Sequence, residues 1–173
     1  QLDIKKILEN DKIGEKIRNG FHISIIGEVN AGKSSLLNLL AKRDVAIVSE
    51  EAGTTRDVIE TYLNIDGYPV ILADTAGIRK SKNEIEKKGV SLALGKHKEA
   101  DLNIIMIDNS KSKVDKEILN LINYDSIVVL NKSDINDNVY QDFKADTILI
   151  SVKNNKNINK LIIKIKDKLS KKY

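Results

Sequence analysis

The segment from Gly27 to Ser34, Gly-Glu-Val-Asn-Ala-Gly-Lys-Ser, has the spacing G-x-x-x-x-G-K-S of a phosphate-binding P-loop. An apolar run over residues 21–26 predicts a buried strand before it, and residues 35–40 predict a helix after it. This order of strand, loop and helix is the context that the motif requires. Its glycines let several backbone N–H groups point at one anion, and the start of the helix adds its positive end. The segment therefore predicts a nucleoside triphosphate site, with Lys33 at the β- and γ-phosphates and the Ser34 hydroxyl on a magnesium ion.

The composition is that of one globular domain. Of the 173 residues, 41% are hydrophobic and 31% are charged, and the chain is long enough to bury a core. No apolar run approaches the roughly 20 residues that cross a bilayer, and cysteine is absent, so we expect no membrane partner and a cytoplasmic location. The net charge of +4 is too mild an excess to decide for RNA. Because the chain begins at Gln1 and its only methionine is Met106, we expect a piece of a longer protein.

Apolar periodicity divides the chain into helices and strands. Helical spacing over residues 2–18 predicts an amphipathic helix that ends at Asn19-Gly20, so we expect residues 1–20 to lead into a nucleotide-binding domain over residues 21–173. Asp66-Gly67 predicts a hairpin turn. The alternation predicts an α/β fold, with a mostly parallel six-stranded sheet, one antiparallel strand and helices on both faces. The expected strands cover residues 21–26, 58–65, 68–73, 102–108, 126–130 and 147–150, and the expected helices cover residues 35–40, 89–100, 114–122 and 158–169.

Polar motifs follow the carboxyl ends of the expected strands, where open α/β sheets bind nucleotides. One of them is Asn131-Lys132-Ser133-Asp134. The carboxylate of Asp134 can accept hydrogen bonds from the N1–H and the exocyclic amine of guanine, a pair of donors that adenine lacks. We expect Asn131 and the stem of Lys132 to brace the loop and cover the ring. The segment Ser151-Val152-Lys153 follows the last expected strand, and by this position alone it is expected to be a further base-contact loop.

The magnesium side of the site is expected beyond another strand. The segment Asp74-Thr75-Ala76-Gly77 follows the strand over residues 68–73. Its aspartate suits the magnesium ion, its glycine N–H suits the γ-phosphate, and Thr55 could complete the metal shell. Ile78 is unusual, because many GTPases carry at this position a glutamine that orients the attacking water. Either this chain hardly hydrolyses GTP, or the catalytic polar group comes from elsewhere.

These motifs together resemble those of one family. Over essentially its whole length, the chain resembles the G domain of the tRNA-modification GTPases of the MnmE, or TrmE, family. The matching residues are 30–38, 46–48, 52–57, 74–79 and 131–134. Residues 84–89 fit this family better than a related ribosome-assembly GTPase with two G domains. The resemblance implies a GTPase that uses Mg2+ and K+ and forms a homodimer through its G domains. In the longer protein it also implies tRNA and a flavin-containing partner protein, for modification of the wobble uridine.

The resemblance also assigns roles to individual residues. Glu86 matches the catalytic glutamate, which positions the water once two G domains meet face to face. The loop over residues 49–54, partly through main-chain carbonyls, would hold a potassium ion where other GTPases place an arginine finger. The expected metal ligands are Ser34 and Thr55 for magnesium, and Asn30, Ser49, Glu51 and Thr54 for potassium. The expected GTP-binding residues are Asn30, Ala31, Gly32, Lys33, Ser34, Ser35, Ser49, Glu50, Glu51, Ala52, Gly53, Thr54, Thr55, Asp74, Thr75, Ala76, Gly77, Asn131, Lys132, Asp134, Ser151, Val152 and Lys153.

The chain departs from the family's pattern where Val29 replaces a proline, Ser49 a threonine and Glu51 an apolar residue. Nothing in it resembles the family's folate-binding domain, helical domain or C-terminal cysteine motif, so the tRNA chemistry is expected outside this chain. Two other functions stay open, a GTP-dependent switch of ribosome assembly and a nucleotide-binding regulator with negligible turnover. Without the family, Glu86 reads as a solvated helix residue beside two lysines.

Overall fold

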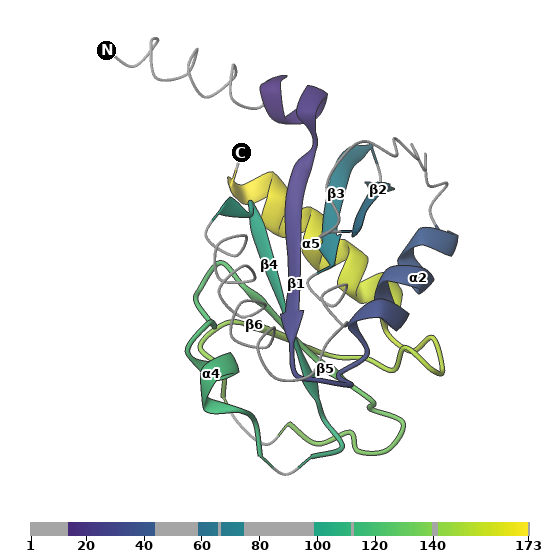
Figure 1. Cartoon of the computed structure of the whole chain (residues 1–173), viewed down its shortest axis with the longest axis vertical. Coiled ribbons are helices and arrows are strands. Elements are labelled where there is room, and N and C mark those ends of the chain that lie inside the picture. The colour runs from purple at the N-terminus through teal and green to yellow at the C-terminus, as the bar shows by residue number, and fades with distance from the viewer. Residues whose placement is uncertain are drawn as a thin grey trace.

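One six-stranded sheet organises the computed structural model, which describes residues 14–43, 59–65, 67–74, 99–111, 113–139 and 142–172 (Figure 1). The strands are β1 (Phe21–Gly27), β2 (Ile59–Ile65), β3 (Tyr68–Asp74), β4 (Leu102–Asp108), β5 (Ile127–Asn131) and β6 (Asp146–Leu149), and the helices are α2 (Lys33–Arg43), α4 (Lys116–Leu119) and α5 (Ile158–Lys172). The sheet order is β2-β3-β1-β4-β5-β6. The pairing of β2 with β3 is antiparallel, and every other neighbouring pair is parallel. The mostly parallel sheet predicted from the sequence is confirmed.

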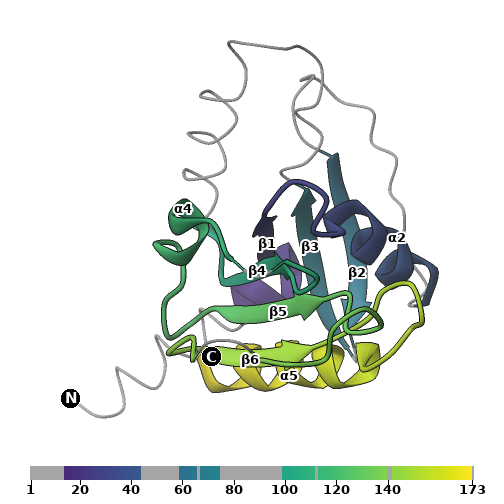
Figure 2. The same cartoon turned by 90° about the horizontal axis from the view of Figure 1, so that it is seen from below.

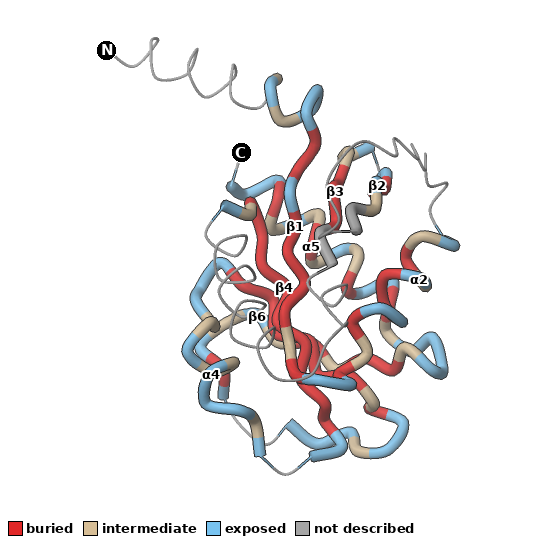
Figure 3. The backbone as a smooth tube through the Cα atoms, in the orientation of Figure 1, coloured by how far each residue is buried: buried red, intermediate tan, exposed pale blue. Residues whose placement is uncertain are grey.

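Alternate residues of the central strands face two hydrophobic cores. Leu102, Ile104 and Met106 of β4 belong to a core that α2 and α5 cover. Ile107 of the same strand belongs to a second core, which Ile118 of α4 joins. A period of two with apolar residues on both sides is what a strand buried on both faces requires. Figure 3 accordingly shows β1 and β4 buried along most of their length, and Figure 2 shows α5 running beneath β6. The expectation of helices on both faces is confirmed.

The strand register brings four carboxyl ends to one edge of the sheet. Ile25 of β1 lies opposite Asp74 at the end of β3, and Gly27 lies opposite Met106 of β4. Asp108 at the end of β4 lies opposite Asn131 at the end of β5. The described residues that follow β1, β4 and β5 therefore share one edge, where the polar motifs of an α/β sheet are expected.

The antiparallel strand comes from the predicted hairpin. β2 and β3 match the expected ranges 58–65 and 68–73 to within one residue at each end. At the turn, Gly67 has a φ of 92°, and its N–H donates to Asn64 Oδ1 at 2.7 Å. A left-handed backbone at this position suits glycine, because other residues carry a Cβ that crowds the chain.

Helix α4 is shorter than expected. The sequence predicted a helix over residues 114–122, whereas only Lys116–Leu119 is α-helical. Asp115 starts it as the N-cap, with its side chain accepting from the Glu117 N–H. Beyond it, the N–H groups of Leu121 and Ile122 bond three residues back, to Ile118 and Leu119. These tighter turns replace the α-helical bonds while still directing apolar side chains into the second core.

The N-terminal helix ends where the sequence predicted. Residues 14–19 are helical, and Gly20, with a φ of 87°, donates its N–H to Lys16 O at 2.8 Å. The rest of the predicted helix over residues 2–18, and most of the one over residues 89–100, lie outside the described residues. Among the helices in the described ranges, none has the length and apolar character needed to cross a membrane.

Candidate nucleotide-binding site

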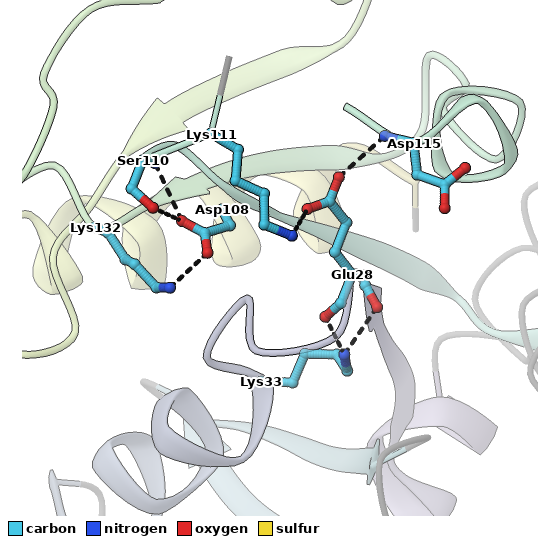
Figure 4. Close-up of polar contacts among 8 residues, drawn as sticks. Glu28, Lys33, Asp108, Ser110, Lys111, Asp115 and Lys132 are labelled. Atoms are coloured by element: carbon cyan, nitrogen blue, oxygen red, sulfur yellow. Dashed lines mark hydrogen bonds and ion pairs between the residues drawn. The ribbon is translucent and has the colours of Figure 1, made fainter. Parts of the chain in front are cut away.

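The P-loop runs from the end of β1 into the first turn of α2. Asn30 has a φ of 65° and Gly32 a φ of 99°, so the chain curls twice through left-handed conformations. Lys33 folds back over this curl, and its Nζ donates to Gly27 O at 2.8 Å and Glu28 O at 2.7 Å (Figure 4). Because only 8% of Lys33 is exposed, these two carbonyls hold a buried ammonium group at the loop. The arrangement is a preformed anion site of the kind that P-loops supply.

Asn131 joins the P-loop to the segment after β6. Its Nδ2 donates to Ala31 O at 2.8 Å, and its Oδ1 accepts from the Val152 N–H at 3.1 Å. Asn131 is buried, so both bonds lie away from water. One side chain therefore brings together three segments that the sequence placed in the site, as the expected brace requires.

Lys132 has a left-handed backbone and a fixed ammonium group. Its φ of 68° is uncommon for a residue with a long side chain. Its Nζ donates to Asp108 Oδ2 at 2.5 Å, and Asp108 also accepts from the Ser110 N–H and hydroxyl. Burial works to raise the pKa of Asp108, but the bonds from Lys132 and Ser110 outweigh it and lower that pKa below its usual value. The carboxylate stays ionised and holds the lysine stem in place.

Asp134 is held by the segment after β6. Ser151 Oγ donates to Asp134 Oδ1 at 2.6 Å, and this bond lowers the pKa of the carboxyl below its usual value. The Ser133 N–H donates to Ile150 O at 3.0 Å, which fixes the backbone beside it. Asp134 itself is exposed, so its carboxylate is accessible to a ligand in the ionised form that accepts hydrogen bonds.

Residues 22–132, more than half of the chain, match a family model described as the 50S ribosome-binding GTPase. The chain belongs to this GTPase family. Its GTPase domain is similar to the tRNA modification GTPase MnmE of Pelagibacter ubique, with 63% identity over 134 residues that cover 78% of this chain and 30% of that protein. MnmE of Wolbachia pipientis subsp. Culex pipiens is 46% identical over 173 residues, which cover 98% of this chain and 38% of that protein. The chain thus spans 30% and 38% of the length of these two relatives.

Two solved structures share the fold. Era from Aquifex aeolicus, bound to GDP·AlF4−, aligns with a TM-score of 0.64 and 30% identity, covering 86% of this chain and 56% of that one. The G domain of the FeoB iron transporter of T. maritima aligns with a TM-score of 0.61 over 88% of this chain and 98% of that one. At 22% identity, the second likeness supports the fold alone. The predicted α/β P-loop GTPase fold is confirmed, and membership of the GTPase family supports the predicted GTPase activity.

Several expected site residues of the GTPase domain fall outside the described residues. They are residues 49–55, expected to bind potassium and magnesium, residues 75–77, expected to bind the nucleotide, and residue 86, the expected catalytic glutamate. Their roles stay predictions. Asp74 is placed through its backbone at the end of β3, opposite Ile25.

The described residues can supply part of a magnesium site. Ser34 lies in the first turn of α2, directly after Lys33. No group of three or more His, Asp or Glu side chains that could hold a metal occurs within the described ranges. Magnesium in phosphate sites is bound through one or two protein ligands plus phosphate oxygens, and it keeps several waters. A hydroxyl beside the anion site fits that chemistry, so Ser34 would hold the ion only together with the nucleotide's phosphates.

The sequence did not single out three residues that shape the site: Glu28, Asp108 and Lys111. Asp108 had one signal, since it is the polar residue that ends an otherwise apolar strand, and such positions reach the carboxyl edge of the sheet. Glu28 occupies a variable position of the P-loop motif, and Lys111 lies in a polar loop, so nothing in the sequence paired them. Their ion pair joins residues that are 83 positions apart.

Proposed function

We propose that this domain binds Mg-GTP with residues 27–34 around the phosphates and Asp134 at the base, and that it is the G domain of a tRNA wobble-uridine modification GTPase. The observation that supports it most is the Asn131 side chain, which joins Ala31 of the P-loop to Val152. This bridge brings the phosphate motif beside the base motifs. The 63% identity to an MnmE protein supports the tRNA role.

The hydrolysis step needs a polar group that Ile78 lacks. In this step water attacks the γ-phosphorus, the bond to the oxygen that bridges the β- and γ-phosphates breaks, and GDP and phosphate leave. We propose that Glu86 orients the water when two domains meet face to face. A potassium ion held by Asn30 and the loop over residues 49–54 would offset the charge that develops on the leaving oxygen. Thr55 and Ser34 would hold the magnesium ion.

The test is GTP hydrolysis as a function of protein concentration, in potassium and in sodium. We expect the rate per molecule to rise with concentration and to be about tenfold or more higher in potassium. Glu86→Ala should lower the potassium-stimulated rate by about 10²-fold, the usual worth of a residue that transfers or orients a proton. Glu84→Ala, two residues away, is the matched control and should hydrolyse GTP at the unsubstituted rate.

Three results would contradict these proposals. An equal rate for Glu86→Ala and the unsubstituted chain would remove the glutamate from the mechanism. A rate independent of concentration and of the cation would remove the dimer and the potassium ion. Equal, near-zero rates in both salts would favour a nucleotide-binding regulator with negligible turnover.

The family's description favours a second candidate, a GTP-dependent ribosome-binding switch. Its output would be docking rather than tRNA modification. Cosedimentation with 50S subunits in the presence of GTP, and its absence with GDP, would favour this candidate. For either role, we propose tRNA and a flavin-containing protein, or the ribosome, as partners that the longer protein meets in the cytoplasm.

A further inference from the structure

Glu28 belongs to the P-loop, but its side chain turns away from Lys33 toward the connection between β4 and α4 (Figure 4). Glu28 Oε2 lies 3.0 Å from Lys111 Nζ, and Glu28 Oε1 accepts from the Asp115 N–H at 3.0 Å. The Glu28 side chain is 7% exposed, whereas that of Lys111 is 49% exposed. We call these three groups, the Glu28 carboxylate, the Lys111 ammonium and the Asp115 N–H, the Glu28 clasp.

The clasp acts on the same residue that holds the P-loop lysine. The main-chain oxygen of Glu28 accepts from Lys33 Nζ at 2.7 Å. A buried carboxylate is costly unless it is paired and hydrogen-bonded, so losing either partner would press the side chain toward water. Such a movement would turn the peptide of Glu28, and with it the carbonyl that places the lysine.

The clasp rests on residues that are themselves fixed at both ends of the connection between β4 and α4. The Lys111 N–H donates to Asp108 O at 3.1 Å, and the Asp108 carboxylate binds Ser110 and Lys132. At the other end, Asp115 caps α4. The connection therefore holds the P-loop through Glu28 and the base motif through Lys132.

We propose that Glu28 is a positioning residue, which the Lys111 ammonium and the Asp115 N–H hold so that its carbonyl sets Lys33 for the β-phosphate of a guanine nucleotide. The inference rests on the proposed function of residues 27–34 as the phosphate site. It assigns Lys111 a role in phosphate affinity although its ammonium group bonds the protein and not the ligand.

The direction in which two substitutions change GDP affinity distinguishes this role from a simple charge effect. If the charges acted on the phosphates through space, Lys111→Met would weaken GDP binding and Glu28→Gln would strengthen it, because the latter removes a negative charge. If the clasp positions the loop, both substitutions weaken GDP binding. We expect each to raise the dissociation constant of GDP about 3- to 10-fold, and the double variant to bind no worse than the weaker single variant.

The measurement is competition of GDP and of GMP against a fluorescent GDP analogue, on the full chain, with unfolding by denaturant followed in parallel. GMP lacks the β-phosphate, so its affinity should change by less than about twofold. Lys111→Arg keeps the ion pair and should bind GDP as the unsubstituted chain does. Lys113→Met is the matched control, because Lys113 lies exposed in the same connection and has no ion pair within the described residues.

Tighter GDP binding by Glu28→Gln would overturn the inference, as would equal losses for GDP and GMP or an equal loss in Lys113→Met. If Lys111→Met and Glu28→Gln lower the free energy of unfolding but leave GDP affinity unchanged, the inference is also overturned, because the clasp would then be merely structural. If the unsubstituted chain bound no GDP, the proposed function would fail and the inference with it. If the unsubstituted chain binds GDP and both Lys111→Met and Glu28→Gln bind it equally well, the inference alone is overturned.

Discussion

Asp134, the residue that we propose binds the base, presents an ionised carboxylate that accepts a hydrogen bond from Ser151. Replacing Asp134 with Asn should change the preferred base. The carboxylate accepts from both the N1–H and the amine of guanine, whereas an amide offers one acceptor and one donor, which suits the oxygen that xanthine carries in place of the amine. We expect GTP affinity to fall about 10²-fold or more and XTP affinity to rise, in competition against a fluorescent GDP analogue.

The control for this substitution is Asp137→Asn, an exposed aspartate in the same loop, which should leave both affinities unchanged. Equal losses for GTP and XTP would contradict the role of Asp134, because a merely damaged site loses both ligands alike.

We expect Ser151 to set the pH range over which Asp134 binds a guanine base. The folded-state pKa of Asp134 lies below its usual value, because the Ser151 hydroxyl donates to the carboxylate. The ionised form, and guanine affinity with it, is therefore kept until the pH falls through that lowered pKa. Ser151→Ala should raise the pKa, so that GDP affinity is lost at higher pH than in the unsubstituted chain.

The measurement is the GDP dissociation constant between pH 7 and pH 4, with Ser170→Ala on the exposed side of α5 as the control. The nucleotide's own phosphate titrates in the same way with both variants, so the difference between their pH profiles reports Asp134 alone. Coincident profiles of GDP affinity against pH for Ser151→Ala and Ser170→Ala would refute the role of Ser151.

At the scale of elements, the turn of the P-loop depends on Gly32. Its φ is 99°, and a methyl group on it would collide with Asn131 Nδ2, the donor that bonds Ala31. Gly32→Ala should therefore lower the free energy of unfolding by about 1–3 kcal/mol and sharply weaken GDP binding. Gly67→Ala is the matched control, because Gly67 has a φ of 92° with open space around it.

Both variants place an alanine in a left-handed backbone conformation, which carries a similar cost in each. The difference between their free energies of unfolding therefore isolates the collision with Asn131. Denaturant unfolding and GDP titration of the two variants measure it. Equal stability and equal GDP affinity would show that the contact between Asn131 and the P-loop does not matter.

The elements that could be predicted from the sequence are those whose signals are local. The run of apolar residues in β4, the Asp66-Gly67 turn and the P-loop spacing each lie within one short segment, and each was located correctly. Helix α4 was predicted too long, because an apolar period cannot distinguish an α-helix from the tighter turns that follow Leu119.

Long-range pairings could not be predicted in the same way. Glu28 with Lys111 and Asp108 with Lys132 are contacts that the sheet order creates, since β4 lies between β1 and β5. By contrast, Asn131 was expected to brace its loop, and the structure adds that its partners are Ala31 and Val152.

At the scale of the whole molecule, the lysines of α5 bear on the question of an RNA partner. Lys164 and Lys168 form ion pairs with Asp146, and Lys172 donates to Asp101 O at 2.7 Å. These three side chains bond the domain's own acidic and carbonyl groups. The matched region is 30% and 38% of the length of the two MnmE relatives, so we expect the tRNA chemistry of such a protein outside this domain.

Guanine recognition at a P-loop is the claim on which the other proposals depend. Calorimetric titration of the chain with GTP, GDP and ATP, each with magnesium, tests it most directly. Because adenine lacks the donor pair that Asp134 accepts, we predict saturable binding of GTP and GDP, and ATP affinity lower by about 10²-fold or more. ATP binding as tight as GTP binding, or no binding of any nucleotide by the folded chain, would contradict it.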